Sequence, residues 1–387
     1  MPQLELSSTA WHSRRTVAAL NAVSATAQLG QFGIGFILPP IGLQALGQGP
    51  VDIGLVSSAT WAGMLVGLLA APRLCSMLQF RFVAALGLLC SAAALATMPA
   101  QELAYWWLNA SLAGFGTGLR WIANETWLYM GVPSNRRASA VGLHETLIGL
   151  ASFAGPALVG VIDVKGPTAY LTGAAMCLVA VGLLLTVRPG TGASAQREHV
   201  APDQPVRLGV VAVFPLAVAA LGGTLEASWN GLFPVLASNF GWNSSQTAWQ
   251  LFFFGVGSTL LQYPLGLLVQ RYGQHLAVRL CAAVGMATVI GVATVESFWL
   301  ASVLLVLLGG AVAGFLTVSI CGVTDAVPTH LIARAISLVS VAFTASSSVG
   351  PAVLGMITEV VGAGAIPAFA FGLCALLLAL ARSTRSY

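Results

Sequence analysis

The stretch that decides the fold is Arg120–Gly160, RWIANETWLYMGVPSNRRASAVGLHETLIGLASFAGPALVG, in which two apolar runs flank a short basic connector. Five polar or ionisable side chains lie inside or beside these runs: Arg120, Asn124, Glu125, His144 and Glu145. Crossing a hydrocarbon core about 30 Å thick takes about 20 apolar residues, and each run has that length. The stretch therefore predicts two membrane-spanning helices with polar groups at membrane depth.

The same pattern continues along the chain. Only 7% of the 387 residues are charged and 57% are apolar, whereas soluble domains carry about 25% charged residues. The apolar stretches predict spans at 16–38, 51–72, 82–98, 103–127, 138–162, 168–188, 208–236, 246–269, 276–295, 298–322, 333–358 and 362–382. We therefore expect an all-α polytopic membrane protein with twelve transmembrane helices.

Several classes of site have no signature in the sequence. It contains no Walker loop, no dinucleotide-binding glycine motif and no HExxH pair, and these are the motifs that hold phosphates, cofactors or zinc. The six cysteines show no CxxC spacing, so they are interpreted as small hydrophobic residues. We expect no cofactor, no metal site and no nucleic-acid partner.

The basic residues give an orientation, because cytoplasmic connectors are enriched in Lys and Arg. With both termini inside, the outer connectors receive only Lys165, and Arg120 remains in the membrane. The cytoplasmic segments receive Arg14, Arg15, Arg73, Arg81, Arg136, Arg137, Arg188, Arg197, Arg207, Arg271, Arg279, Arg334, Arg382 and Arg385. We expect a multi-pass protein of the inner or plasma membrane with cytoplasmic termini.

An internal repeat relates the two parts of the chain. Pro39 and Pro234 are 195 residues apart, and the same offset relates Gly155-Pro156 to Gly350-Pro351. The first span has a counterpart within the repeat, which argues against the alternative that Ser13-Arg14-Arg15 begins a signal peptide. It predicts two pseudo-symmetric six-helix bundles.

These bundles are predicted at residues 1–188 and 208–387. The polar, Pro- and Gly-rich segment 189–207 joins them as a cytoplasmic linker. Parallel repeats of this kind rock about a central cavity, so the organisation predicts alternating access.

Two motifs carry a family resemblance. Gly266-Leu-Leu-Val-Gln270-Arg271-Tyr-Gly273 resembles the signature between spans eight and nine of the major facilitator superfamily, with Gln270 where Asp is usual. Asn124-Glu125-Thr126-Trp127-Leu128 and Pro133-xx-Arg136-Arg137 are similar to the YcaD-like branch of transporters. The resemblance covers the whole chain and implies the major facilitator fold and transport, without a particular substrate. Leu108–Gly114 lacks the arginine-centred motif of proton-driven drug exporters, which argues against that assignment.

Arg120 and Glu145 form the first candidate pair. Each lies about two helical turns from the cytoplasmic end of its span, and adjacent antiparallel helices bring such positions to a similar depth. Because a charge at membrane depth needs a partner, we predict an Arg120–Glu145 ion pair. It serves either in gating and proton coupling or as a permanent structural pair. His144 is a candidate proton relay, with simple hydrogen bonding as the alternative.

The second set of candidates lies at the cytoplasmic boundary. The family resemblance implies ion pairs there that latch the two halves together in the outward-open state. The alternative is that the arginines set orientation and that Glu125 extends to the membrane surface. The predicted gating residues are Glu125, Arg136, Arg137, Arg73, Arg271 and Asp325.

Glu226 is the candidate for contact with both solute and proton. Asn230 follows one turn later on the same helix face, beside Trp229, and Gln28 and Gln31 lie at the corresponding depth of the first span. In this fold type spans one and seven line the cavity, so we expect these five residues to face each other there. A desolvated Glu226 carboxylate would bind a proton. The alternative is a carboxylic acid that a neighbouring helix satisfies.

Together these features predict a monomeric secondary transporter, not an enzyme, that moves a small solute by alternating access with proton coupling. The polar residues and aromatic walls suit a small polar or cationic amphiphilic solute. Two other classes stay open. A transporter-like sensor or scaffold would need a soluble output domain. A membrane-embedded enzyme would use His144 and Glu145 as acid and base, with a nucleophile or metal cluster nearby.

Overall fold

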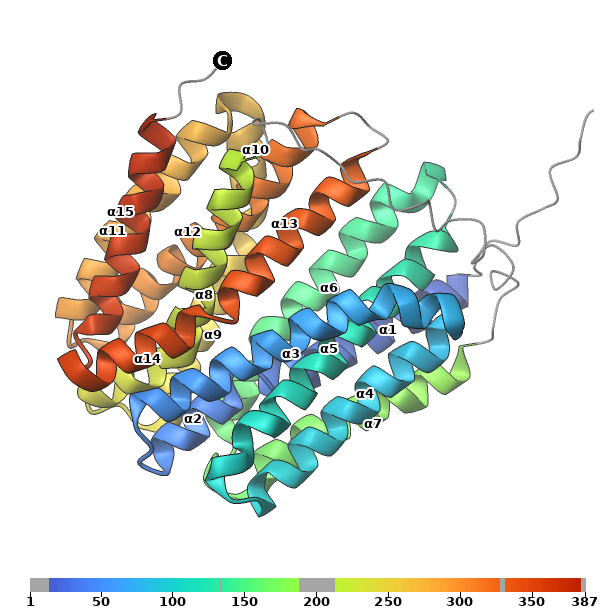
Figure 1. Cartoon of the computed structure of the whole chain (residues 1–387), viewed down its shortest axis with the longest axis horizontal. Coiled ribbons are helices and arrows are strands. Elements are labelled where there is room, and N and C mark those ends of the chain that lie inside the picture. The colour runs from blue at the N-terminus through green and yellow to red at the C-terminus, as the bar shows by residue number, and fades with distance from the viewer. Residues whose placement is uncertain (1–13, 133, 188–212, 328–330, 384–387) are drawn as a thin grey trace, which may run out of the picture.

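The structure is a computed structural model that describes residues 14–132, 134–187, 213–327 and 331–383. All regular elements among these residues are helices (Figure 1). The first part of the chain forms α1 (Arg14–Gln28), η1 (Leu29–Ile34), α2 (Leu38–Ala45), α3 (Pro50–Met77), α4 (Phe80–Thr97), η2 (Met98–Ala100), η3 (Leu103–Tyr105), α5 (Trp106–Met130), α6 (Ser134–Val161) and α7 (Pro167–Thr186). The second part forms α8 (Val213–Asn239), α9 (Ser244–Leu260), α10 (Gln262–Tyr272), α11 (Gln274–Thr294), α12 (Phe298–Ala326), α13 (Ile332–Ser347), α14 (Gly350–Val361) and α15 (Ala365–Ser383).

Each predicted span coincides with a helix or with consecutive helices. Eight helical segments of the described chain have the length and hydropathy to cross a membrane. The predicted spans outside this set correspond to α1 with η1, α5, α6 and α8, and these are the helices that carry most of the candidate site residues. These helices fall outside the set because they carry polar side chains and because the first span is interrupted. The total of twelve therefore stays a prediction.

The first predicted span is interrupted by a π-helical turn, η1. The amide of Gly35 donates to the carbonyl of Gly30 across 3.1 Å, an i→i+5 bond. Such turns insert one extra residue into a helix and are frequent at functional sites. Gln31 and Phe32 lie in this turn, so the irregular backbone carries residues of both sites described below.

The two Gly-Pro pairs of the repeat differ in their effect on the helix. Gly350-Pro351 opens a new helix, α14, after α13 ends at Ser347, as expected from a proline that lacks an amide hydrogen. The α6 helix instead continues through Pro156 to Val161. The pair therefore begins a new helix in the second half and lies inside a continuous helix in the first.

Glycines of the repeat make equivalent close contacts inside the two halves. Gly155 of α6 lies against Gly33 of η1, where an added Cβ would be 2.2 Å from Gly33 Cα. Gly350, 195 residues later, lies against Ser228 of α8, where a Cβ would be 2.5 Å from Ser228 Oγ. Gly33 and Ser228 are also 195 residues apart. Close helix approach of this kind requires a residue without a side chain.

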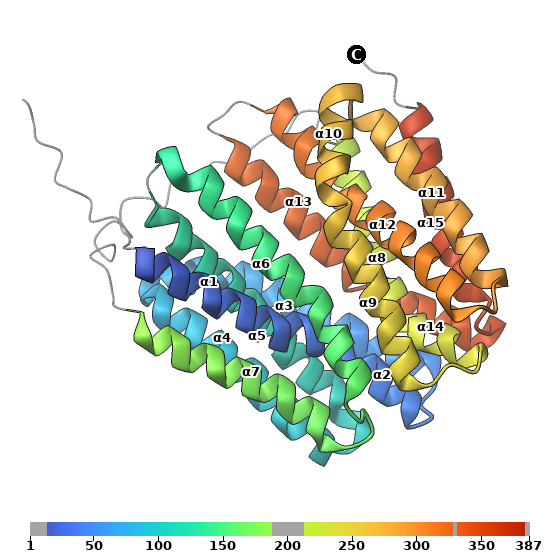
Figure 2. The same cartoon turned by 180° about the vertical axis from the view of Figure 1, so that it is seen from behind.

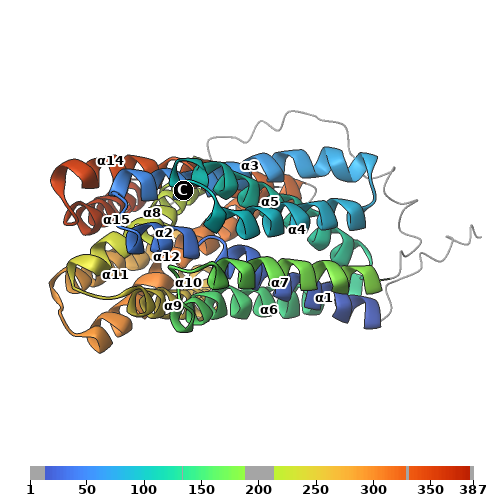
Figure 3. The same cartoon turned by 90° about the horizontal axis from the view of Figure 1, so that it is seen from below.

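The same offset relates the contacts between the halves. Gly160 of α6 meets Ser245 and Trp249 of α9, whereas Gly355 of α14 meets Pro50 and Gly54 of α3. Every residue of the second contact is 195 positions from its counterpart in the first. We call this end of the molecule the closed end. Figure 2 shows α6 beside α9 there, and Figure 3 shows the two bundles side by side.

From the closed end the two bundles diverge. α1 begins and α15 ends at the far end, where the helices of the two halves are splayed apart (Figures 1 and 2). We call it the basic end, because these arginines occupy the helix termini there: Arg15, Arg73, Arg81, Arg271, Arg279 and Arg382. The predicted linker 189–207 and the chain ends at 1–13 and 384–387 lie outside the described residues.

Candidate functional site

Arg120 lies at the centre of a buried polar network in the first half. Its side chain is 1% exposed. Nε donates to Gln31 Oε1 across 2.8 Å, and Nη2 donates to Gln28 Oε1 across 2.9 Å. Two neutral amide oxygens thus replace water around a guanidinium that an apolar environment would otherwise destabilise.

The far ends of the two glutamines fix this arrangement. Gln28 Nε2 donates to Ser152 Oγ of α6 across 3.0 Å, and Gln31 Nε2 donates to Ser91 Oγ of α4 across 2.7 Å. Because each amide nitrogen is engaged by a hydroxyl, each amide oxygen is directed at the guanidinium. The network therefore joins α1 and η1 to α4, α5 and α6.

The predicted ion pair between Arg120 and Glu145 is not formed, and this prediction is wrong for the observed conformation. Glu145 is exposed and accepts a hydrogen bond of 3.4 Å from the Tyr129 hydroxyl. Arg120 faces η1 instead. Similar depth along neighbouring helices does not determine which way each side chain points, and Gln28 and Gln31 occupy the face that Arg120 presents.

His144 lies in a second buried cluster, between α1, α5 and α6. Its side chain is 0% exposed; Nδ1 is 2.9 Å from Asn21 Oδ1, and Nε2 is 3.7 Å from Glu125 Oε1. The Tyr129 ring stands edge-on to the imidazole at 5.7 Å. Asn21 and Tyr129 were missed in the sequence, since a lone Asn or Tyr in an apolar helix gives no signal of its own.

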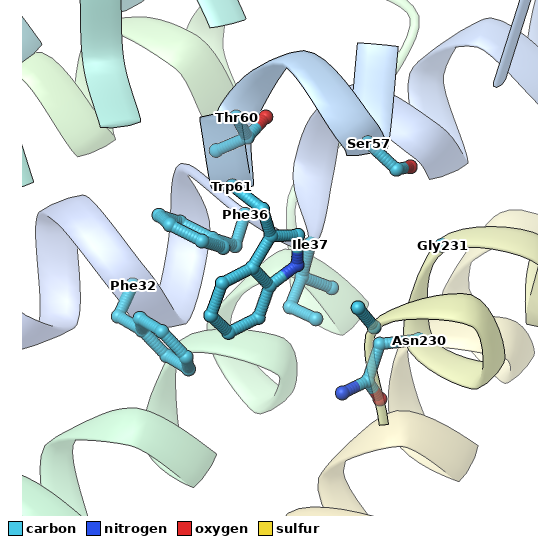
Figure 4. Close-up of a pocket in the computed structure, with 9 residues that line it drawn as sticks. Phe32, Phe36, Ile37, Ser57, Thr60, Trp61, Asn230 and Gly231 are labelled. Atoms are coloured by element: carbon cyan, nitrogen blue, oxygen red, sulfur yellow. The ribbon is translucent and has the colours of Figure 1, made fainter. Parts of the chain in front are cut away.

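A pocket lies where the two halves meet (Figure 4). Its cavity is small in the observed conformation, about 20 Å³. Its lining comes from η1 and the turn after it, from α3 and from α8: Phe32, Phe36, Ile37, Ser57, Thr60, Trp61, Ala227, Asn230 and Gly231.

Aromatic rings form one wall of this pocket. Phe32 stacks on Phe36 at 4.6 Å between ring centres, and Trp61 stands edge-on to Phe36 at 5.1 Å and to Phe32 at 5.9 Å. Trp61 also contacts Phe343 of α13 at 6.1 Å. Rings that support one another in this way form a rigid apolar surface, which Asn230, Ser57 and Thr60 supplement with hydrogen-bonding groups.

The predicted solute-binding residues divide into two groups. Asn230 lines the pocket, and the partly exposed Glu226 lies one turn before it on α8. The Glu226 carboxylate forms no hydrogen bond with any residue that the structure describes. Trp229 is only 1% exposed and packs on Phe233 at 5.7 Å, away from the pocket lining.

Gln28 and Gln31 also lie outside the pocket lining, at 1% and 2% exposure. They and Trp229 do not line this pocket, so their contact with solute stays a prediction. Their polar groups are buried because they hold Arg120, and the ring of Trp229 packs inside the second bundle.

The predicted gating residues lie apart from one another. Arg73, Arg136, Arg271 and Asp325 are exposed at the basic end, and within the described chain none of them forms an ion pair. The guanidinium of Arg271 stacks on the neighbouring Tyr272 ring at 5.3 Å. Glu125 is engaged by His144, and the side chain of Arg137 lies outside the described part. The splayed end holds the expected partners apart, so the latch stays a prediction.

With this geometry in place, comparison with protein families identifies the fold. The model of the Major Facilitator Superfamily matches residues 20–229 and 216–385, which is most of the chain. The chain belongs to the Major Facilitator Superfamily. Membership makes it a multi-pass membrane protein. The narrower YcaD-like branch stays a prediction.

Relatives in the Major Facilitator Superfamily share modest identity with the chain. It is 24% identical over 258 residues to the uncharacterized MFS-type transporter YfkF of Bacillus subtilis, covering 65% of each protein. It is 25% identical over 237 residues to an uncharacterized MFS-type transporter of Yersinia enterocolitica, covering 59% of this chain and 60% of that protein. The matched segments thus span less than two thirds of these relatives.

Solved structures of the same superfamily share the fold. A mutant of the nucleoside transporter NupG superposes with a TM-score of 0.82 at 14% identity, covering 95% of this chain and 99% of NupG. An inward-facing, occupied bacterial homologue of the human lysosomal transporter Spinster gives 0.71 at 15% identity, covering 95% and 93%. Neither these matches nor the geometry favours the enzyme or the sensor alternative. His144, which the enzyme alternative would use as an acid or base, contacts Asn21 and Glu125.

Proposed function

We propose that this chain is a secondary active transporter of the inner or plasma membrane that moves a small solute by alternating access. The observation that carries the proposal is the position of the pocket. It lies between the halves, next to the closed end, and the helices diverge from it towards the basic end. A site in this position is exposed to one side at a time as two rigid bundles rock.

With the termini in the cytoplasm, the basic end faces inwards and the observed conformation is open to the cytoplasm. The positive-inside rule supports this orientation, since arginines gather at that end and the exposed Lys165 lies at the other. The pairs of contacts at Gly160 and Gly355 close the outer side. Repacking of these two pseudo-equivalent contacts opens it.

The solute proposed for this pocket is a small polar or cationic amphiphilic molecule. Rings at Phe32, Phe36 and Trp61 offer π faces to a flat or cationic group, and Asn230 offers both a donor and an acceptor. NupG is a nucleoside transporter. A nucleoside base would suit the same rings and amide, so nucleosides are the second class to test.

We propose protons as the coupling ion, with Glu226 as the carboxylate that binds them. Glu226 lies one turn from the pocket residue Asn230, and its carboxylate forms no hydrogen bond within the described chain. An intramembrane carboxylate without a partner exchanges protons with an aqueous path more readily than one held in an ion pair. The earlier candidates Arg120, His144 and Glu145 lie in the first bundle, away from the pocket lining.

The test is uptake and efflux in proteoliposomes with an imposed pH gradient, using a panel of organic cations and nucleosides. We expect at least one class to move against its gradient in the unaltered protein. Glu226→Gln should abolish gradient-driven accumulation while leaving solute exchange at equal pH. Accumulation by Glu226→Gln equal to that of the unaltered protein would contradict the coupling assignment. A reconstituted, folded protein that moved no member of the panel would count against the proposed solute classes.

A further inference from the structure

We propose that His144 and Glu125 hold a shared proton, and that this protonated pair ties α6 to α5 and α1 when the molecule is splayed at the basic end. The inference goes beyond the proposed function, because it assigns a proton-binding site in the first bundle, separate from Glu226 and the solute pocket. Only its role in coupling rests on the proposed function. The site itself is tested without transport.

The position of the first imidazole hydrogen follows from Asn21. Its Nδ2 donates to the carbonyl of Val17 across 3.0 Å, so its Oδ1 is the atom that faces the ring. His144 Nδ1 lies 2.9 Å from that oxygen. An amide oxygen only accepts hydrogen bonds, so Nδ1 carries a hydrogen.

A second proton is required on the other side of the ring. His144 Nε2 faces Glu125 Oε1 at 3.7 Å and has no hydrogen-bond partner among the described residues. With one hydrogen on Nδ1, a neutral ring would direct its Nε2 lone pair at a carboxylate, and two acceptors repel. A proton on Nε2 or on Glu125 turns this contact into an attraction of N–H⁺ with O⁻ or of O–H with N.

The charges around the ring favour the same conclusion. Glu125 and Tyr129 face it from α5, the neutral Asn21 faces it from α1, and Glu145 follows it on α6 and accepts from Tyr129. Arg120 is near enough to interact electrostatically with Glu125. Two carboxylates and one guanidinium leave one negative charge, which a proton on His144 neutralises. At membrane depth a neutral cluster is favoured over a charged one.

The exposure of Glu125 gives the proton a route, and the role of Glu125 in the predicted latch gives its binding a consequence. The Glu125 side chain is 20% exposed, whereas His144 is 0% exposed, so the proton enters and leaves through Glu125. Glu125 is also the carboxylate that the predicted latch at the basic end requires. Binding to protonated His144 withholds Glu125 from that latch, so protonation favours the splayed conformation.

The site is tested by NMR of protein in lipid nanodiscs with isotopically labelled histidine and glutamate. The chain has five histidines, and His144→Gln assigns the signal. We expect the His144 ring and the Glu125 carboxyl to titrate together. In Glu125→Gln the ring should lose the proton that it shares, so the signals of Nδ1 and Nε2 should become those of a neutral imidazole. Glu102→Gln makes the same chemical change at an exposed position outside the cluster, so it is the matched control and should leave the His144 signal unchanged.

Independent titration of His144, unchanged by Glu125→Gln, would overturn the shared proton. The conformational role has its own readout, the distance between spin labels at Gln79→Cys and Gln270→Cys, which are exposed at the basic end on opposite halves. Acidification should lengthen this distance in the otherwise unaltered protein and not in His144→Gln. An equal response in both would overturn that role. A protein inactive on every solute, with the coupled titration intact, would count against the proposed function alone.

Discussion

Arg120 Nε donates to Gln31 Oε1 across 2.8 Å inside the first bundle, and the counterpart of Gln31 in the second bundle, 195 residues later, is Glu226. The fourth span of the repeat drifts to an offset of 200, as Ala113-Gly-Phe and Ala313-Gly-Phe show, so Ile320 stands opposite Arg120. The second bundle therefore has an acid where the first has an amide, and no guanidinium beside it. This asymmetry supports the proposal that Glu226 is the carboxylate that binds the coupling proton.

The first prediction concerns the buried network. Gln31→Leu removes the acceptor of Arg120 Nε and leaves a buried cationic donor unsatisfied, which should lower the free energy of unfolding by about 2–3 kcal/mol. Gln101→Leu makes the same chemical change at an exposed position and should have little effect. Thermal or denaturant unfolding in detergent measures both. Equal stability of the two variants would mean that Arg120 does not depend on Gln31.

The second prediction concerns the closed end. Gly355→Val places side-chain atoms against the carbonyl of Pro50, since even a Cβ would be 2.5 Å from that oxygen. Because backbone cannot move aside cheaply, overpacking of about 1–3 kcal/mol should favour opening at this end. Gly372→Val, where a Cβ would meet nothing within 4 Å, is the matched control.

The readout is a short cross-link across the closed end. Gln44 Nε2 donates to Ser238 Oγ across 3.1 Å, so Gln44→Cys and Ser238→Cys should react rapidly with a bifunctional thiol reagent. We expect Gly355→Val to slow this reaction about tenfold, which corresponds to about 1.4 kcal/mol. If the Gly372→Val protein slowed as much, the contact at Gly355 would not control closure.

The fold could be predicted from the sequence because it depends on features that many residues contribute to together. Apolar length indicated the spans, arginine placement indicated a common basic end, and the 195-residue offset indicated two halves with corresponding positions. The structure shows that equivalent positions make equivalent contacts, such as Gly155 with Gly33 and Gly350 with Ser228. Each of these signals survives an error of a few residues in a helix boundary.

The partners of single side chains depend on the rotation of each helix, which the sequence does not encode as directly. A helix turns 100° per residue, so a π-helical turn such as η1 changes which side chains face a neighbour. Gln31, which lies in this turn, faces Arg120. Glu125 faces His144, a pairing that the order of residues along α5 and α6 does not indicate. Asn230, on the regular helix α8, lines the pocket between the halves, and its contact with solute stays a prediction.

The third prediction concerns orientation. Lys165→Cys, exposed between α6 and α7, should react with a membrane-impermeant maleimide applied to intact cells, and Arg73→Cys at the basic end should react only after the membrane is permeabilised. The native cysteines Cys75, Cys177, Cys281 and Cys374 are buried, and the partly exposed Cys90 and Cys321 are replaced by Ser to keep the background low. The reverse labelling pattern would place the basic end outside and make the observed conformation outward-open.

The fourth prediction concerns solute binding at the aromatic wall. Trp61→Leu keeps an apolar residue in α3 but removes the ring that contacts Phe32, Phe36 and Phe343. A cation–π or stacking contact contributes about 0.5–2 kcal/mol, so the Kd of a transported organic cation should rise by about 2–30-fold. Trp299→Leu, at a position 71% exposed, is the matched control and should bind normally. Trp61→Phe should restore most of the affinity, because a π face returns to the same wall. Binding by Trp61→Leu equal to that of the control would place the solute away from this pocket, even if transport itself were intact.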